Sequence, residues 1–269
     1  MLARKRFGQH FLHDRAVIRR IVDAVDPRPG ERLVEVGPGR GALTWDLLER
    51  AGGLDVIEID RDLARLLVED PRAGARLRMH VESALDADFV RLRDGGAPLR
   101  VVGNLPYNIS TPLLFRLLDQ RAAIADMHFM LQREVVDRLA AAAGDEHYGR
   151  LSVMVAAYAE VERLFDVGPG AFHPRPAVWS SVVRLRPQLE PRFALGSPGA
   201  LRTLVTAAFS ARRKTLRNGL KALLDAHDIE ACGIDPQHRP ETLTPAQFGL
   251  LAQRFSGLRD AALRYTGGP

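Results

Sequence analysis

The chain has 269 residues, of which 46% are hydrophobic, so it can bury a large core as one long domain or as one domain with a smaller companion. No apolar run approaches the roughly 18 residues of a membrane span, and no apolar stretch follows the basic start as it does in a signal peptide. The single cysteine, Cys232, excludes an internal disulfide and a Cys-rich zinc site, and the eight histidines lack ligand spacing, so we expect no metal site. We therefore expect a soluble, cytoplasmic protein.

The net charge of +5 is concentrated in the last third of the chain. From Arg184 onward there are 13 Lys or Arg and 7 Asp or Glu, whereas the residues before it hold 25 and 26. The densest basic segment holds Arg212, Arg213, Lys214, Arg217 and Lys221. In a helix, positions 213, 217 and 221 recur every four residues and line one face, which suits the phosphate backbone of a nucleic acid. An ordinary solvated helix face explains the same pattern, but a second basic patch at 4–6 favours nucleic acid.

The first half of the chain alternates between predicted strands and helices. A helix over 15–25 begins after the capping residue Asp14 and ends before Pro27 and Pro29. Strands are predicted over 32–36, 54–59, 77–81, 99–103 and 127–131. One helix is predicted to begin near residue 42, and a second follows the strand over 54–59 and ends at residue 67. Further helices are predicted over 112–118 and 134–143. Strands that are spaced by helices predict a parallel sheet covered on both faces.

The pattern changes after Gly149. Residues 151–158 and 180–185 are predicted as strands that close the sheet, with a loop around Phe172 between them. Beyond Pro187 the pattern is helical, with breaks at prolines and glycines. We therefore expect a larger domain over 1–187 and a small helical domain over 188–269.

A glycine-rich loop follows the first predicted strand of the sheet. Gly37, Gly39 and Gly41 lie at a strand-to-helix turn, where glycine lets the backbone approach a ligand and helix amides point at it. Glu58 lies 21 positions after Gly37, at the end of the next strand. A carboxylate at this position accepts a hydrogen bond from a ribose hydroxyl of a bound cofactor. The pair indicates a nucleoside-containing cofactor, and the G-x-G-x-G spacing favours one without a pyrophosphate. NAD enzymes share the layout, and a helix cap with an incidental surface Glu also explains it.

The most informative residues are Asn104, Leu105, Pro106 and Tyr107, which follow the strand predicted over 99–103. Asn104 offers an oxygen that accepts a hydrogen bond but does not act as a base. Pro106 stiffens the backbone, so the Leu105 carbonyl can be held in one direction, and Tyr107 offers a flat face to a base. Two oxygens and a ring suit the exocyclic amine of a planar base, although a plain turn with a half-buried tyrosine fits the same four residues.

Together these features resemble the S-adenosylmethionine-dependent methyltransferases that modify the N6 amine of adenine. Three further stretches, 7–12, 148–153 and 172–180, look like elements of the ribosomal RNA adenine dimethyltransferases, and 208–218 is most similar to the KsgA type. The resemblance covers nearly the whole chain. It implies a class I (Rossmann-like) α/β methyltransferase sheet with a small helical, basic RNA-binding domain. It also implies S-adenosylmethionine as cofactor and, as product, N6,N6-dimethyladenosine at two adjacent sites near the 3′ end of small-subunit (16S) rRNA.

The resemblance also implies a role for each matching residue. His10 and Leu12 would cover the cofactor. Gly37 and Gly39 would approach its methionine portion, and Glu58 would hold its ribose. Asn104 would lie between the cofactor and the target amine, and Phe172 would stack on the adenine opposite Tyr107. Two positions depart from the family pattern. His10 stands where Asn is common, and Ser83 stands where an Asp usually contacts the cofactor adenine. Because a serine lacks the charge-assisted component of that bond, we expect weaker cofactor binding than in Asp-bearing relatives.

Several alternatives stay open from the sequence. A Rossmann dehydrogenase fits the glycine loop, a DNA adenine methyltransferase shares the catalytic residues, and a large-subunit rRNA dimethyltransferase is the nearest enzymatic neighbour. A non-catalytic RNA-binding assembly factor on the same scaffold is the fourth. Nothing suggests an obligate dimer, so we expect a monomer. Trp179, close to the Phe172 loop, is predicted to pack against the protein, with a contact to RNA as the alternative.

Overall fold

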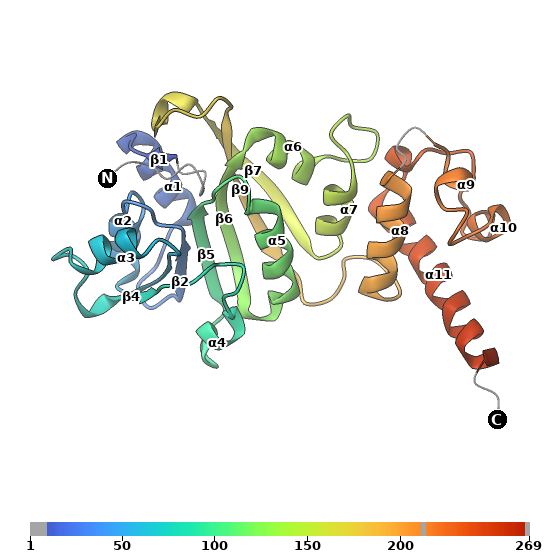
Figure 1. Ribbon diagram of the computed structural model, residues 1–269, viewed down its shortest axis with the longest axis horizontal. Helices are drawn as coiled ribbons and strands as arrows, with labels where there is room; N and C mark the ends of the chain where they lie inside the picture. The colour runs from blue at the N-terminus through green and yellow to red at the C-terminus, as the bar shows by residue number, and fades with distance from the viewer. Residues whose placement is uncertain (1–9, 211–213, 267–269) are drawn as a thin grey trace. The chain divides into compact units, whose positions relative to one another are not determined.

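The computed structural model describes residues 10–210 and 214–266 (Figure 1). Two compact units make up the chain: residues up to 136 together with 160–187, and residues 137–159 together with those from 188 onward. The sequence predicts one boundary at 187, so the two divisions differ in the segment 137–159. That segment packs within the second unit, where the Tyr148 hydroxyl donates a hydrogen bond to the Leu243 carbonyl at 2.8 Å.

The first unit is built on a seven-stranded sheet. Its strands are β2 (Leu33–Val36), β3 (Leu54–Ile57), β4 (Leu77–His80), β5 (Leu99–Asn104), β6 (Ile124–Gln132), β7 (Ala159–Val167) and β9 (Ser180–Pro187). They lie in the order β4-β3-β2-β5-β6-β9-β7, in which β4 to β6 are parallel and β9 is antiparallel to β6. A separate ribbon pairs β1 (Phe11–Leu12) with β8 (Phe172–His173). The predicted α/β class with a parallel sheet is confirmed.

Four helices connect the parallel strands: α2 (Thr44–Ala51), α3 (Arg61–Val68), α4 (Phe89–Arg93) and α5 (Ser110–Asp119). Helix α1 (Arg15–Val25) precedes β2 and α6 (Arg133–Ala140) follows β6, and short 3-10 helices lie at Gly74–Arg76, Arg121–Ala123 and Pro169–Ala171. The predicted cap of α1 is present, since the Asp14 carboxylate accepts hydrogen bonds from the amides of Ala16 and Val17.

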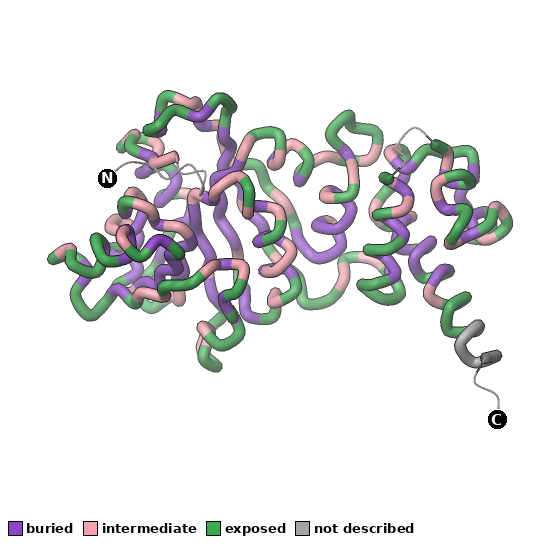
Figure 2. The backbone as a smooth tube through the Cα atoms, in the orientation of Figure 1, coloured by how far each residue is buried: buried purple, intermediate pink, exposed green. Residues whose placement is uncertain are grey.

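The strand order reverses between β2 and β5. The chain proceeds from β2 to β3 and β4 on one side, and then crosses to β5 and β6 on the other. Because such crossovers are right-handed, α2 and α3 cover one face of the sheet and α4 and α5 cover the other. The inner strands are therefore buried along most of their length, whereas the edge strands β4 and β7 are partly exposed (Figure 2). An α/β sheet binds its ligands at such a reversal, beyond the carboxyl ends of the strands.

Residues 151–158 were expected as a strand, and this prediction is wrong. They lie mostly in α7 (Arg150–Ala156), whose first turn is capped by Ser152: its hydroxyl accepts a hydrogen bond from the Gly149 amide and donates one to the Arg138 carbonyl. A short apolar run fits a buried helix as well as a buried strand. The strand at the edge of the sheet is instead β7, in which apolar and charged residues alternate and which the sequence interpretation missed.

The second unit is helical, as the sequence predicts beyond Pro187. Its helices are α7, α8 (Pro198–Ser210), α9 (Leu216–Gly219), α10 (Ala226–Glu230) and α11 (Pro245–Thr266), with a 3-10 turn at Pro240–Thr242. The Phe209 ring lies between Tyr148 and Phe248, with ring centroids 6.1 and 5.5 Å away. These aromatic contacts fix α7, α8 and α11 around one apolar core.

A glycine in β5 lets the two central strands approach closely at the reversal. A Cβ on Gly103 would lie only 2.5 Å from the Val36 carbonyl oxygen and 3.0 Å from the Leu105 side chain. Backbone atoms cannot move away from such a contact without shifting β2 or β5. The residue is therefore required by the packing of the strands that carry the glycine loop and Asn104.

Gly103→Ala should lower the free energy of unfolding by about 1–3 kcal/mol, the usual cost of an added group in a packed core. Urea denaturation monitored by circular dichroism measures this change. Gly199→Ala is the matched control, because Gly199 lies in α8 with nothing within 4 Å of the added carbon. There the helix propensity of alanine should leave the stability unchanged or raise it. Equal urea midpoints for Gly103→Ala and Gly199→Ala would contradict the steric argument.

Candidate active site

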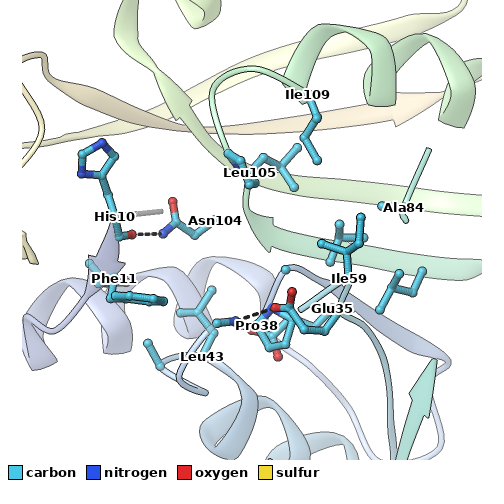
Figure 3. A pocket seen from close by; sticks show the side chains of 18 of the residues that line it. His10, Phe11, Glu35, Pro38, Leu43, Ile59, Ala84, Asn104, Leu105 and Ile109 are labelled. Atoms are coloured by element: carbon cyan, nitrogen blue, oxygen red, sulfur yellow. Dashed lines mark hydrogen bonds between the residues drawn. The ribbon is translucent and has the colours of Figure 1, made fainter. Parts of the chain in front are cut away.

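A pocket lies at the carboxyl ends of the parallel strands, at the reversal of the strand order (Figure 3). Residues that follow β2, β3, β4 and β5 form its wall, and residues 10–12 of the N-terminal segment close one side. All of these residues belong to the first unit. The strand ends therefore bring together side chains that lie far apart in the sequence.

The glycine loop and Glu58 form one end of the pocket. Gly37 and Gly39 have φ angles of +65° and +58°, which L side chains rarely adopt. The Gly39 amide donates a hydrogen bond to one Glu58 oxygen at 3.3 Å, and the Asp60 amide donates to the other at 2.9 Å. Burial raises the pKa of Glu58, and these backbone donors oppose the rise. Each carboxylate oxygen keeps a lone pair that can accept a further hydrogen bond.

Glu35, which the sequence interpretation passed over, lies in β2 beside the glycine loop and also lines the pocket. Its side chain is 2% exposed, and within the described residues its Oε2 atom has no hydrogen-bond partner. Burial raises the pKa of Glu35 to about 8; the nearby Thr44 hydroxyl opposes the rise and the Glu58 charge adds to it. The signal in the sequence was an acidic residue inside an otherwise apolar strand, next to a glycine loop.

The amide of Asn104 has a fixed orientation at the end of β5. Its Nδ2 atom donates a hydrogen bond to the His10 carbonyl at 3.1 Å, which leaves Oδ1 as the available acceptor (Figure 3). The Leu105 amide donates to the Met130 carbonyl at 3.2 Å, and the Leu105 side chain is buried. Within the described residues the Leu105 carbonyl accepts no hydrogen bond. Adjacent residues that line the pocket therefore carry two acceptor oxygens, and no donor among the described residues reaches either of them.

Tyr107 stands at the edge of the same pocket. Its hydroxyl shares a hydrogen bond with the Ser180 hydroxyl at 3.1 Å, and its ring centroid lies 5.6 Å from that of His10. Burial raises the pKa of the Tyr107 phenol, and the Ser180 bond partly opposes this rise. The ring is thus held as a neutral, flat surface two residues after the Leu105 carbonyl.

This chain is similar over nearly its whole length to proteins that modify ribosomal RNA. The family model described as ribosomal RNA adenine dimethylase matches residues 1–256. The chain belongs to the ribosomal RNA adenine dimethylase family. Two similar relatives are named ribosomal RNA small subunit methyltransferase A. The Pseudomonas aeruginosa protein is 54% identical to this chain over 95% of this chain and 96% of its own length. The Nitrosococcus oceani protein is 57% identical over 90% of this chain and 92% of its own length.

Solved structures agree with membership in the dimethylase family. The 23S rRNA methyltransferase ErmE aligns with a TM-score of 0.71 and 27% identity over 91% of this chain and 99% of that chain. A dimethyladenosine transferase from Plasmodium falciparum aligns with a TM-score of 0.73 and 24% identity over 90% and 96% of the two chains, and shares the fold. The chain is thus an rRNA adenine dimethyltransferase of class I fold, and neither a dehydrogenase nor a DNA methyltransferase.

Most of the predicted site residues of this dimethylase lie together. Those that line the pocket are His10, Leu12, Gly37, Gly39, Glu58, Ser83, Asn104, Leu105, Pro106 and Tyr107. The hydroxyl of Ser83 accepts a hydrogen bond from the Leu85 amide at 3.2 Å and so caps the turn after β4. Residues 7–9 of the predicted N-terminal motif lie outside the described residues.

Phe172 is the exception among the predicted pocket residues. It pairs with Leu12 in the β1–β8 ribbon, is only 3% exposed and packs in the hydrophobic core. It is absent from the pocket wall. A ring with so little exposed surface offers no open face to a base, so this arrangement does not support the expected stacking position.

The basic segment does not form the continuous helix that its spacing predicts. Lys214, Arg217 and Lys221 are exposed, but Thr215 is extended and α9 spans only Leu216–Gly219. The amides of Leu216 and Arg217 donate hydrogen bonds to the carbonyls of His238 and Pro236, so this turn is tied to a distant segment instead of to a preceding helical turn. Arg212 and Arg213 lie outside the described residues.

Across residues 10–210 and 214–266, no three His, Cys, Asp or Glu side chains cluster so as to hold a metal ion. No helix in the same ranges is both long and apolar enough to cross a bilayer.

Proposed function

We propose that this pocket binds S-adenosylmethionine and that the chain methylates the N6 amines of two adjacent adenosines near the 3′ end of small-subunit rRNA, giving N6,N6-dimethyladenosine. The names of the most similar relatives support the small subunit as the source of the substrate. The observation that carries the proposal is the geometry of Asn104, whose Nδ2 is engaged by the His10 carbonyl while Oδ1 is available.

The residues of the pocket fit this cofactor. Glu58 keeps acceptor capacity on both oxygens for the ribose hydroxyls, and Gly37 leaves room for close approach, since even an added Cβ there would have no atom nearer than 3.9 Å. Within the described residues the Oε2 of Glu35 has no hydrogen-bond partner, and once its raised pKa is lowered by a bound cation the carboxylate would be a negative partner for the positively charged methionine portion. Apolar side chains such as Ile59 and Leu105 provide surfaces for the base and the aliphatic parts.

The residues around Asn104 would activate the target by positioning. The cofactor supplies an electrophilic methyl group on a sulfonium. Asn104 Oδ1 and the Leu105 carbonyl accept the two N6 hydrogens of adenine, which favours a geometry in which the nitrogen lone pair points away from both oxygens. The methylated amine is cationic and acidic, so water removes its proton and no side chain has to act as a base. Such alignment lowers a barrier by up to about 7–11 kcal/mol in the best cases.

The target adenosine must leave its stack to reach these oxygens, at a cost of a few kcal/mol. Tyr107 offers the surface on which the flipped base stacks, and the bond to Ser180 holds the ring for it. After the first transfer one N6 hydrogen remains, so the monomethyl product keeps one of the two hydrogen bonds. The second methylation then proceeds with that bond alone.

The remaining residues would bring the RNA to the pocket. The exposed Lys214, Arg217 and Lys221 would contact phosphates from the helical domain, together with Arg212 and Arg213. The enzyme is proposed to act as a monomer. A substrate in the ribosomal subunit or its precursor fits a cytoplasmic enzyme.

Transfer of labelled methyl groups to small ribosomal subunits that lack the modification tests this proposal. We expect N6,N6-dimethyladenosine at two adjacent sites per particle, resolved by mass. Transfer to large subunits alone would overturn the assignment of the substrate. No transfer to either subunit with RNA binding intact would make the chain a non-catalytic assembly factor.

Ser83→Asp should strengthen cofactor binding roughly 5- to 10-fold, because a carboxylate adds a charge-assisted hydrogen bond to the cofactor adenine. Aspartate can keep the capping bond to the Leu85 amide, so the turn after β4 should stay intact. Isothermal titration with S-adenosylmethionine measures the change, and Ser83→Ala is the control that loses both bonds. An unchanged or larger dissociation constant for Ser83→Asp would contradict this account of the departure from the family pattern.

A further inference from the structure

The loop between β8 and β9 exposes a large aromatic side chain next to Ser180, whose hydroxyl bonds the pocket residue Tyr107. Trp179 is 52% exposed and Val178 43%, although aromatic side chains of this size are mostly covered in folded proteins. Arg175, in the same loop, is also exposed and forms no ion pair with the carboxylates of the described residues. An unpaired guanidinium four residues from an exposed indole indicates a surface for a ligand that is both flat and anionic.

The position of Trp179 is fixed at its backbone. Its carbonyl accepts a hydrogen bond from the Arg133 amide at 2.9 Å, and its indole lies against Gly168, where an added Cβ would be 3.7 Å from the ring. The next residue is Ser180, which is buried and shares a hydrogen bond with the Tyr107 hydroxyl. Because successive side chains alternate at the start of a strand, Ser180 points to Tyr107 and Trp179 points outward.

We propose that Trp179 is a stacking platform for the nucleotide next to the target adenosine, and that Arg175 contacts the phosphate beside it. This inference rests on the proposed function. A base that flips into the pocket against Tyr107 leaves its neighbour without a stacking partner on that side. Trp179 precedes Ser180, the residue that holds Tyr107, and its indole points to the other side of the chain, so a neighbouring nucleotide of the same strand would reach the indole by passing over the start of β9. Aromatic platforms that accept any base are a common way of holding such unstacked nucleotides.

The pairing of adjacent targets gives this subsite a specific occupant. When one of the two adenosines is in the pocket, the other is the adjacent nucleotide and meets Trp179. The subsite would therefore hold the second adenosine during methylation of the first, and it would act on substrate binding more than on the chemical step. A change at Trp179 should then alter KM for the RNA more than kcat.

Steady-state methylation of small subunits by Trp179→Ala, Trp179→Phe and Val178→Ala tests the platform. We expect Trp179→Ala to raise KM for the subunit roughly 10- to 100-fold with kcat within about twofold, and Trp179→Phe to recover most of the loss. Val178→Ala removes a neighbouring exposed apolar side chain and should leave KM unchanged. Equal KM values for Trp179→Ala and the wild type would overturn the proposal. So would equal increases in Trp179→Ala and Val178→Ala.

Fluorescence gives a readout that does not depend on turnover. The chain has two tryptophans, and Trp45 is partly buried with the Arg72 guanidinium 4.1 Å from its ring, so a Trp45→Phe variant reports Trp179 alone. An RNA hairpin with two adjacent loop adenosines, added at concentrations at which anisotropy shows binding, should quench this emission. A hairpin with an abasic residue beside the target adenosine should quench it much less. Equal quenching by both hairpins would overturn the proposal, whereas a wild-type chain without methyl transfer would overturn the proposed function instead.

Discussion

Asn104→Ala should lower kcat for methyl transfer by roughly 10²–10³-fold or more, with RNA affinity near that of the wild type. The alanine removes Oδ1, one of the two acceptors that would align the N6 amine, and losses of this size follow removal of a single polar group that acts in a transition state. The side chain lies at the pocket wall and not on the exposed basic segment, so phosphate contacts should be unaffected. Filter assays of transfer and RNA retention measure the two effects on one preparation.

Asn104→Asp separates the two hydrogen bonds of the amide. Aspartate keeps an acceptor oxygen but cannot donate to the His10 carbonyl, and its charge faces that carbonyl. We expect activity well below the wild type, because an ionised aspartate would be repelled by the carbonyl that now fixes the amide. Turnover near the wild-type level in Asn104→Ala would contradict the assignment, and a parallel loss of RNA affinity would indicate that the pocket wall had shifted.

The convergence of the pocket residues was predictable because it is encoded locally. The glycine loop, Glu58 and the residues from Asn104 to Tyr107 each follow a strand that apolar periodicity identifies. The carboxyl ends of parallel strands meet at one edge of the sheet, so the sequence also predicts that these segments converge. The pocket wall contains Gly37 and Gly39 of the glycine loop, Glu58 and the residues from Asn104 to Tyr107.

The features that were not predictable depend on contacts between distant segments. The run over 151–158 is helical because its apolar side chains are covered within the second unit, which a single sequence does not show. The basic segment is broken because Leu216 and Arg217 bond to residues 236–238. Phe172 does not line the pocket because it pairs with Leu12 in the β1–β8 ribbon. In each case a tertiary contact overrides a local pattern.

Glu35→Gln should change the pH dependence of both stability and cofactor binding. In the free protein the Glu35 pKa is about 8, whereas it is 4.5 in an unfolded chain. Below pH 4.5 Glu35 is protonated in both the folded and the unfolded state, so its titration does not change the free energy of unfolding. Between these values only the folded state keeps the proton, so the free energy of unfolding falls as pH rises, by about 1.36 kcal/mol per pH unit, and the fall ends near pH 8. Summed over this window, the loss is on the order of 5 kcal/mol.

Glutamine fills the same space without this proton, so the stability advantage of Glu35→Gln over the wild type should grow as pH rises from 5 to 8.5. Urea unfolding across that range measures it, and a pH-independent difference would contradict the raised pKa. A cofactor cation beside Glu35 favours the carboxylate and so lowers its pKa on binding. Wild-type affinity for S-adenosylmethionine should therefore rise with pH up to about 8, with a proton released to the buffer. Calorimetry in buffers of different ionisation enthalpy should detect that proton for the wild type and none for Glu35→Gln, because the buried carboxyl is its only source in this account.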